Sequence, residues 1–214
     1  GNYCYLPLYI FAGNYLLCAR LREANQDASA GSLVEVARIC QQIRARWPQV
    51  KIILRADSGF AREELMAWCE SCQDIYYLFG LAKNARLIDE IKIELEQAKQ
   101  MYEISKAPAR VFKDFTYRTL DSWTCERRVV AKAEHMEKGA NPRFIVSSLP
   151  SQLIAAQSLY QDHYCARGEM ENKIKEQKLD LCSDRTSTHW MKANQLRLYF
   201  SAIAYLLLNL FRQV

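Results

Sequence analysis

Apolar and polar positions alternate along the first part of the chain in a way that predicts strands and helices in turn. Two apolar runs, 2–11 and 15–22, flank the turn formers Gly13 and Asn14, an arrangement typical of an antiparallel hairpin. Behind a capping box that begins at Ser32, apolar residues recur at helical spacing. A helix is therefore expected after the hairpin.

The next part of the chain predicts two buried strands, each followed by a helix. The apolar runs 51–56 and 74–82 have the length and composition of strands, and helices are expected over 61–72 and 85–101. The order strand, strand, helix, strand, helix, strand matches a ribonuclease-H-like core that lacks its first strand. We therefore predict an α/β fold with a mixed sheet flanked by helices, and we assign residues 1–105 to this core.

Residues 106–150 have a different sequence pattern, in which apolar residues alternate with charged and polar ones. This pattern predicts a β-rich segment ahead of the C-terminal helices, which occupy residues 151–214. Two long helices are expected there, over 164–178 and 190–212. In the last helix, six large side chains are expected to pack against the sheet: Leu196, Tyr199, Ile203, Leu206, Leu207 and Leu210.

Composition and charge narrow the class of protein only a little. A chain of 214 residues with 50% hydrophobic residues is long enough to bury a substantial core. The net charge of +5 is modest, but basic residues concentrate between Arg110 and Arg143, which is consistent with a surface that faces phosphates. The uncharged run 198–211 is too short to span a bilayer, so no membrane role is predicted.

Eight scattered cysteines without a signal peptide favour reduced thiols and a cytoplasmic location. Cys69 and Cys72 form a CxxC pair, but no second pair or matching histidines accompany it. We therefore expect these two cysteines to pack as ordinary small side chains, and His163 and His189 to be polar loop residues rather than metal ligands.

The segment 164–178 carries the first candidate chemistry. On an α-helix, its four candidate residues would fall within an arc of about 60° and form a stripe about 21 Å long. They are Tyr164, Arg167, Glu171 and Lys178. A carboxylate between cations suits both a metal ion and a polyanion. A solvated helix with an ordinary ion pair between Arg167 and Glu171 would show the same stripe, so the stripe alone does not establish a site.

The spacing of these residues resembles a signature of DDE transposases of bacterial insertion sequences, the cut-and-paste type. The signature is Tyr, two residues, Arg, three residues, Glu, six residues, Lys. The resemblance implies that Glu171 is the third catalytic acid of the family. It also implies that Tyr164, Arg167 and Lys178 contact the DNA of the transposon end.

A second motif follows the predicted strand 51–56. Arg55-Ala56-Asp57-Ser58-Gly59-Phe60 stands at the carboxyl end of this strand, where ligands gather in open α/β sheets. Taken alone, Asp-Ser-Gly is more typical of a plain turn. Beside the helix signature, it resembles the second catalytic aspartate of the same transposase family, and it stands in the expected order along the chain.

The resemblance implies DNA cleavage and strand transfer, which are phosphoryl-transfer reactions. Two Mg²⁺ ions about 4 Å apart, or Mn²⁺ in their place, would be bound by Asp57, Glu171 and a third carboxylate. The family also carries a β insertion that helps to hold DNA; it corresponds to residues 106–150, with Arg127 and Arg128 as candidate contacts. The implied partners are transposon ends and target DNA, bound by a homodimer in the bacterial nucleoid.

The first catalytic aspartate of the family has no counterpart in this sequence. It is expected on a strand ahead of residues 2–11, and the acids before Asp57 are Glu23, Asp27 and Glu35, none of which is placed to replace it. We therefore predict a fragment of a transposase catalytic domain that does not cleave DNA by itself.

Two other functions remain open. A DNA-binding module would keep contacts such as Arg167 and Lys178 and would show salt-dependent DNA binding without metal-dependent cleavage. A ribonuclease-H-like nuclease would hydrolyse strands without joining them, although the long insertion and the tyrosine-to-lysine spacing disfavour it. A purely structural protein has the least support, because nothing would then require Asp57 and Glu171 to converge.

Overall fold

Two compact units make up the chain. Unit 1 combines both ends of the sequence, Gly1–Ile43 and Arg167–Val214, and unit 2 is the continuous segment Arg44–Ala166. The computed structural model describes residues 4–213, apart from the side chain of Arg167, so the start of the predicted strand 2–11 lies outside the described residues. Within residues 4–213, no helix is both long enough and apolar enough to cross a membrane.

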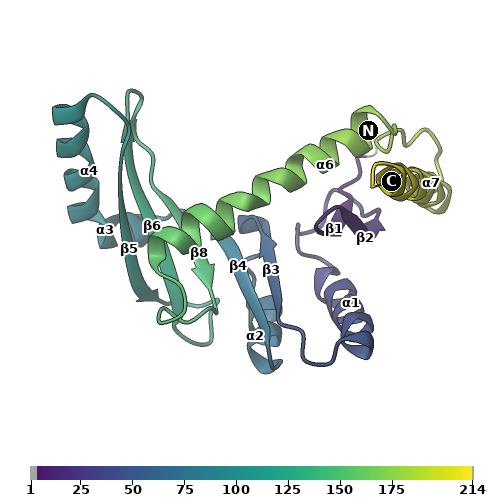
Figure 1. Cartoon of the computed structure of the whole chain (residues 1–214), viewed down its shortest axis with the longest axis horizontal. Coiled ribbons are helices and arrows are strands. Elements are labelled where there is room, and N and C mark those ends of the chain that lie inside the picture. The colour runs from purple at the N-terminus through teal and green to yellow at the C-terminus, as the bar shows by residue number, and fades with distance from the viewer. Residues whose placement is uncertain (1–3, 214) are drawn as a thin grey trace. The chain divides into compact units, whose positions relative to one another are not determined.

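A mixed sheet forms the centre of unit 2 (Figure 1). Its strands are β3 (Ile52–Ala56), β4 (Ile75–Leu81), β5 (Ala109–Tyr117), β6 (Arg127–Met136), β7 (Gly139–Ala140) and β8 (Arg143–Ser147). They follow the order β3-β4-β8-β6-β5, and β7 pairs with β6. β3 and β4 run parallel, whereas β8 pairs antiparallel with both β4 and β6. The predicted α/β architecture with a mixed sheet is confirmed, and the β-rich segment extends the same sheet that β3 and β4 begin.

Helices cover one face of this sheet, which we call the α2 face. Tyr77 of β4 donates a hydrogen bond from Oη to Glu70 Oε1 of α2 (Glu63–Ser71), over 2.7 Å. Farther along, α4 (Lys92–Ser105) lies against β5 and β6. The short helix α3 (Ala85–Glu90) precedes α4, and buried Ile91 separates the two where one helix was predicted.

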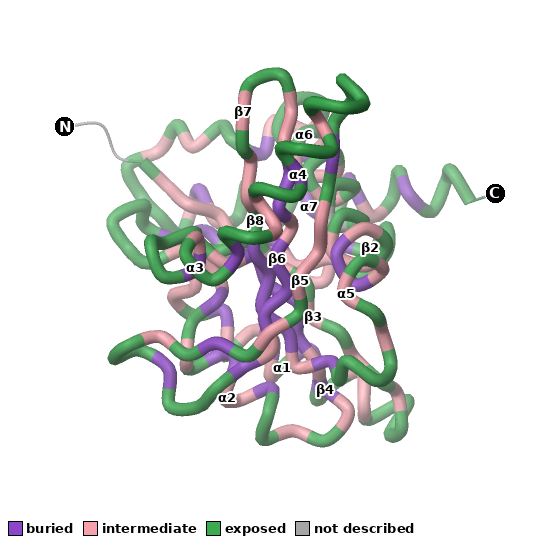
Figure 2. The backbone as a smooth tube through the Cα atoms, turned by 90° about the vertical axis from the view of Figure 1, so that its left-hand side faces the viewer, coloured by how far each residue is buried: buried purple, intermediate pink, exposed green. Residues whose placement is uncertain are grey.

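The opposite face, the η2 face, is covered by the segment between β8 and the end of unit 2. Leu78, Val130 and Ile145 of the sheet pack there with Leu159 and Tyr160. These last two residues belong to the π-helical turn η2 (Leu159–Tyr164), which follows the short helix α5 (Ala156–Ser158). Figure 2 shows β6 as a buried strand at the centre of this arrangement.

In unit 1, a hairpin packs against the C-terminal helix. The strands β1 (Leu8–Ala12) and β2 (Tyr15–Arg20) form the predicted antiparallel pair, in a separate two-stranded sheet. Helix α7 (Met191–Phe211) buries one face against them. The shared core consists of Tyr9, Leu16, Ala19 and Leu21 from the hairpin region and Leu198, Ala202 and Tyr205 from α7.

This packing corrects the predicted buried face of α7. Four of the six large side chains expected to be buried are about half exposed: Leu196, Ile203, Leu207 and Leu210, at 53%, 54%, 51% and 53%. Tyr199 is 48% exposed, and Leu206 is partly buried. The helix turns a different stripe inward, because the smaller Ala202 allows close approach to the hairpin while Tyr205 and Leu198 fill the space beside it.

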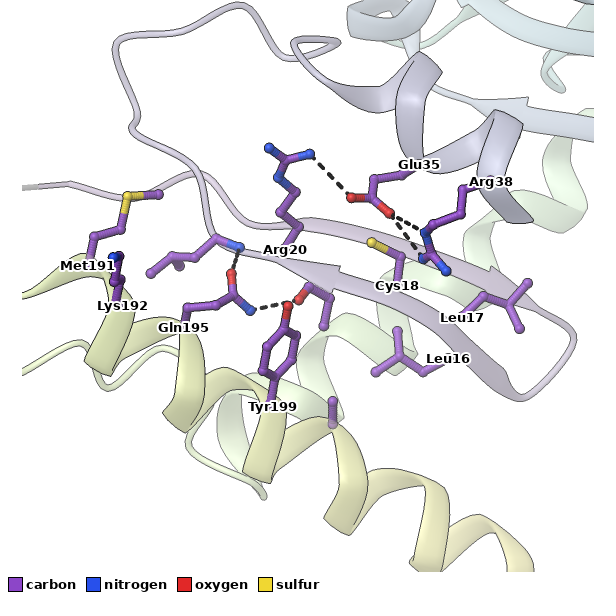
Figure 3. Close-up of a pocket in the computed structure, with 13 residues that line it drawn as sticks. Leu16, Leu17, Cys18, Arg20, Glu35, Arg38, Met191, Lys192, Gln195 and Tyr199 are labelled. Carbon is purple, nitrogen blue, oxygen red and sulfur yellow. Dashed lines mark hydrogen bonds and ion pairs between the residues drawn. The ribbon is translucent and has the colours of Figure 1, made fainter. Parts of the chain in front are cut away.

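A single glutamine side chain joins α7 to the edge of β2 (Figure 3). Gln195 Oε1 accepts a hydrogen bond from the Leu21 main-chain nitrogen at 2.6 Å, and its Nε2 donates to the Ala19 oxygen at 3.0 Å. Gln195 lines a pocket beside β2. Glu35 of α1 (Ser32–Arg46) lines the same pocket and is paired with Arg20 and Arg38. The carboxamide therefore satisfies main-chain groups that a neighbouring strand would otherwise satisfy.

Candidate active-site residues

Asp57 stands at the carboxyl end of β3, as predicted, in a turn that its own side chain stabilises. It caps the short 3-10 helix η1 (Ser58–Phe60): Asp57 Oδ1 accepts a hydrogen bond from the Gly59 main-chain nitrogen at 2.9 Å. The Phe60 nitrogen also donates to the Asp57 carbonyl oxygen at 3.2 Å. The carboxylate is exposed and fixed in direction, which suits a residue that holds a ligand at the end of the sheet.

Gly80 of β4 lies directly beside this turn, in a space with no room for a side chain. An ideal Cβ on Gly80 would lie 2.6 Å from Tyr164 Oη and 2.9 Å from the Ser58 main-chain nitrogen. It would also lie 3.3 Å from the Asp57 carbonyl carbon. The structure therefore brings two of the predicted site residues, Asp57 and Tyr164, to one position on the sheet. Sequence reasoning missed Gly80, although a glycine inside a strand can mark a close backbone approach.

Several contacts hold the Tyr164 segment against the sheet. The rings of Tyr160 and Tyr164 lie 5.6 Å apart, and Lys132 Nζ lies 5.6 Å from the centre of the Tyr160 ring. Arg55 Nη1 donates a hydrogen bond to the His163 carbonyl oxygen at 3.0 Å. Since Arg55 precedes Asp57 by two positions, η2 is attached to the strand that carries the candidate acid.

A row of basic residues continues from this position across the same end of the sheet. Arg143 of β8 pairs directly with Lys132 of β6, and Arg110 of β5 pairs directly with Glu134. Directly paired residues share a face, and residues two apart on a strand do so as well. Arg110, Lys132 and Arg143, the basic row, therefore lie on the η2 face near the end where Asp57 stands.

Glu134 is a buried acid that pairs with two members of the basic row, Arg110 and Lys132. It is 3% exposed, and its carboxylate lies 2.6 Å from both Arg110 Nε and Lys132 Nζ. Burial raises the pKa of Glu134, but the hydrogen bonds from Lys132 and Arg110 outweigh it, so the pKa is lowered below the ordinary value of 4.5. Arg110 and Lys132 share this one carboxylate and Arg143 adds a third cation, so the row keeps an excess of positive charge.

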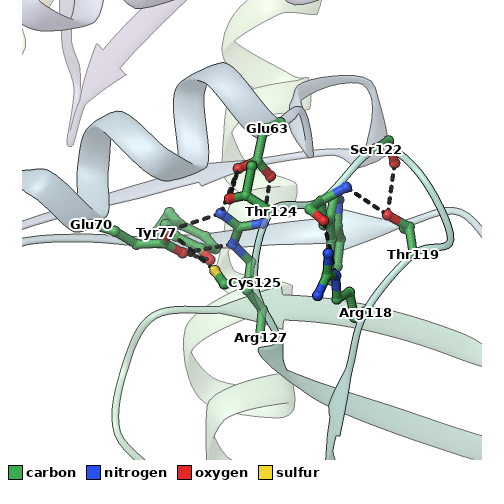
Figure 4. Close-up of polar contacts among 10 residues, drawn as sticks. Glu63, Glu70, Tyr77, Arg118, Thr119, Ser122, Thr124, Cys125 and Arg127 are labelled. Atoms are coloured by element: carbon green, nitrogen blue, oxygen red, sulfur yellow. Dashed lines mark hydrogen bonds and ion pairs between the residues drawn. The ribbon is translucent and has the colours of Figure 1, made fainter.

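Arg127 is buried and paired with acids of its own chain, which argues against its predicted contact with DNA. Its side chain is 2% exposed on the α2 face, with Nη1 2.6 Å from Glu63 Oε2 and Nε 2.7 Å from Glu70 Oε1 (Figure 4). Its guanidinium also lies 5.4 Å from the centre of the ring of Trp123, which lies in the loop before β6. The hydrogen bonds from Arg127, the largest influence, lower the pKa of Glu63.

Arg128 is also held inside the protein. Its side chain is 12% exposed, and Nη2 lies 2.6 Å from Asp114 Oδ2. Nη1 and Nη2 donate to the carbonyl oxygens of Leu149 and Ile154, both at 2.8 Å. The geometry therefore argues against both predicted arginine contacts, because all three nitrogens of each guanidinium already donate to acceptors of the chain itself.

Glu171 lies in the first turn of α6 (Gly168–Leu179), in unit 1, and is exposed, as is Lys178 in the last turn. Ile174 of α6 is partly buried and packs against the unit 1 core. The helix predicted over 164–178 is confirmed from Gly168 onward, but its start is wrong, because Tyr164 ends a π-helical turn and 165–167 form the 3-10 turn η3. The side chain of Arg167 lies outside the described residues.

The residue types of the candidate acids fit a divalent cation. Asp57 and Glu171 are exposed carboxylates, the hard oxygen donors that Mg²⁺ prefers. Within residues 4–213, no three or more acidic, histidine or cysteine side chains form a group that could hold a metal ion. Since Asp57 belongs to unit 2 and Glu171 to unit 1, their convergence on one ion stays a prediction.

The sequence matches the model of a known protein family. The sequence model of the family described as "Transposase DDE domain group 1" matches residues 1–214. No curated protein matches the chain.

Proposed function

Because the chain belongs to the DDE transposases, as a member of transposase DDE domain group 1, we propose that it provides Asp57 and Glu171 for metal-dependent cleavage and joining of DNA strands. Members of this family are catalytic and bind DNA. The observation that carries the proposal beyond the family is the position of Asp57, exposed and fixed by Gly59 at the carboxyl end of a parallel strand.

We assign the two acids to metal binding. When bound, divalent ions would activate the attacking water or 3′-hydroxyl and stabilise the leaving oxygen. Asp57 contributes a carboxylate whose direction is already fixed by its own turn. Its side chain therefore loses little conformational freedom when the reaction takes place. Glu171 contributes a second carboxylate from the exposed side of α6.

We propose that the fold is ribonuclease-H-like. The hairpin β1-β2, the parallel pair β3-β4 and the helices between them follow the element order of that fold. This order supports the proposal because the second catalytic acid is then expected at the end of β3, where Asp57 lies.

DNA is proposed to follow the basic row rather than Arg127 and Arg128. Arg143 is exposed, and the side chain of Arg110 is 49% exposed. Phosphate groups bind best where cations are accessible and already oriented. Tyr164 and Lys178 are proposed to contact the transposon end, and two copies of the protein are proposed to act on paired ends.

Binding of Mn²⁺ alone tests the metal site. Water-proton relaxation of the 214-residue chain should show Mn²⁺ binding that Asp57→Asn and Glu171→Gln each weaken about tenfold or more, because a ligand should matter at least as much as its supporting shell. Asp57→Asn keeps the acceptor for Gly59, so it should fold normally. Equal Mn²⁺ binding by wild type and both variants would contradict the proposal.

DNA cleavage distinguishes the enzyme from a DNA-binding module. DNA with the matching transposon ends should be cut and joined in Mg²⁺ by the complete enzyme and not by its Asp57→Asn variant. Binding that falls with salt, together with cleavage that Asp57→Asn leaves unchanged, would favour the binding module and reject the assigned role of Asp57.

A further inference from the structure

The approach of three chain segments at Gly80 has a consequence for the candidate acid. β4 provides Gly80, the turn after β3 provides Ser58, and η2 provides Tyr164. Neighbouring atoms at 2.6 Å and 2.9 Å from an ideal Cβ are closer than real Cβ atoms approach their neighbours. Any side chain at this position would have to displace at least one of the other two segments.

The two neighbours differ in how easily they can move. Tyr164 Oη is the end of a side chain, whereas the Ser58 nitrogen is main chain and belongs to the peptide that directly follows Asp57. Ser58 lies between the two residues of the hydrogen bond that the Gly59 nitrogen donates to Asp57 Oδ1. A shift of Ser58 would therefore change the direction of the Asp57 carboxylate.

Tyr164 is itself held over Gly80 from two directions. Its ring lies against Tyr160, whose own ring lies 5.8 Å from Phe112 of β5. The main chain just before it is fixed by the hydrogen bond from Arg55 to His163. The phenol therefore closes the space above Gly80 from the outside, and the peptide after Asp57 lies beside it.

We propose that Gly80 is a positioning residue for the transposase reaction: its missing side chain lets Tyr164 and the Asp57–Ser58 peptide pack together, and this packing orients the Asp57 carboxylate toward the divalent cation. The inference rests on the proposed role of Asp57. It assigns to Gly80 no contact with DNA or metal, and it gives Tyr164 a second task besides its proposed contact with DNA.

Mn²⁺ binding to the full chain, measured by water-proton relaxation beside the melting temperature, tests the proposal. Gly80→Ala should weaken Mn²⁺ binding about tenfold, the lower end of what loss of a supporting residue usually causes. Ile75→Val is the matched control, because buried Ile75 lies at the opposite end of β4 and pairs with Ile52. It should lower the melting temperature and leave Mn²⁺ binding unchanged.

Tyr164→Phe provides a second variant that adds no atoms and should fold even if Gly80→Ala does not. It removes the hydroxyl group above Gly80 and should weaken Mn²⁺ binding in the same direction, at an almost unchanged melting temperature. If Asp57→Asn binds Mn²⁺ like wild type, the proposed metal site is wrong and the inference falls with it. If Asp57→Asn weakens binding while Tyr164→Phe and any folded Gly80→Ala bind like wild type, the inference alone is wrong.

Discussion

Arg55 donates a hydrogen bond to the carbonyl oxygen of His163, at 3.0 Å, across 108 positions of sequence. The bond attaches the end of β3 to the π-helical turn that ends at Tyr164. A π-helical turn departs from the regular hydrogen-bond pattern of an α-helix, so a side-chain donor to one of its carbonyl oxygens helps to hold the turn in place. Arg55 thus supports the geometry around Asp57 without belonging to the proposed metal site.

Removing this bond should loosen η2 and change global stability little. Arg55 is exposed, so Arg55→Ala should cost about 1 kcal/mol of unfolding free energy or less. Amide hydrogen exchange of residues 160–164 should become faster, since local opening then needs fewer broken contacts. Lys51→Ala, an exposed cation just before the same strand, is the control. Unchanged exchange in Arg55→Ala would show that the bond is dispensable.

Arg127 should contribute to stability rather than to DNA affinity. Arg127→Met leaves Glu63 and Glu70 without their buried partner, and loss of one member of a buried ion pair typically costs about 3–5 kcal/mol. Because both carboxylates are partly exposed, a value at or below the lower end is expected. Urea unfolding measures the loss. A stable variant with clearly weakened DNA binding would restore the original prediction for Arg127.

Arg143 should behave in the opposite way. It is exposed on the basic row, so Arg143→Ala should leave urea unfolding nearly unchanged. Its affinity for duplex DNA should fall across sequences, and the slope of log affinity against log salt should decrease by about one. Arg127→Met, compared under conditions where it is folded, is the matched basic-residue control. An unchanged salt slope in Arg143→Ala would place the DNA elsewhere.

Glu134 should make stability sensitive to acid. Its pKa is lowered in the folded chain, so its contribution is fully present above the ordinary value of 4.5 and is lost as the pH falls through the lower, folded value. Glu134→Gln removes this titration, so its stability should decline less between pH 5 and acid than that of wild type. Urea midpoints at a series of pH values test this, with Glu103→Gln as a variant that removes one exposed carboxylate. Parallel curves for wild type and Glu134→Gln would contradict the prediction.

Gln195 should be required for stable attachment of α7 to β2. Gln195→Ala leaves the Leu21 nitrogen and the Ala19 oxygen without their partner, and about 1–3 kcal/mol of unfolding free energy should be lost. Gln195→Glu keeps an acceptor for Leu21 but cannot donate to Ala19, so an intermediate loss is expected. Equal stability of all three proteins in urea would mean that water replaces the carboxamide at no cost.

The sequence was sufficient to predict most elements and the position of Asp57. Hydrophobic periodicity identified the strands of the sheet, and the turn after 51–56 placed Asp57 at a strand end. It could not choose the buried face of α7, because apolar residues surround that helix and only the shape of the hairpin decides between Leu196 and Leu198.

The differences between the expected and the observed surroundings of the candidate residues have equally local causes. Arg127 is a basic residue in a basic segment, and nothing in the surrounding sequence shows that Glu63 and Glu70 lie beside it. The stripe from Tyr164 assumed about 100° per residue, an angle that does not hold through a π-helical and a 3-10 turn. Gly80 was missed because its importance depends on what approaches it, not on its neighbours in sequence.

Unit 1 is built from the first and last parts of the chain, and this has a consequence for how the protein is made. During translation, the hairpin strands emerge long before Leu198 and Tyr205, the side chains that complete their apolar core. Unit 2 is continuous and can fold while the ribosome is still at work, whereas the core of the hairpin is completed only after α7 has been synthesised. A premature stop codon within α7 would therefore leave β1 and β2 without the side chains that complete their apolar core.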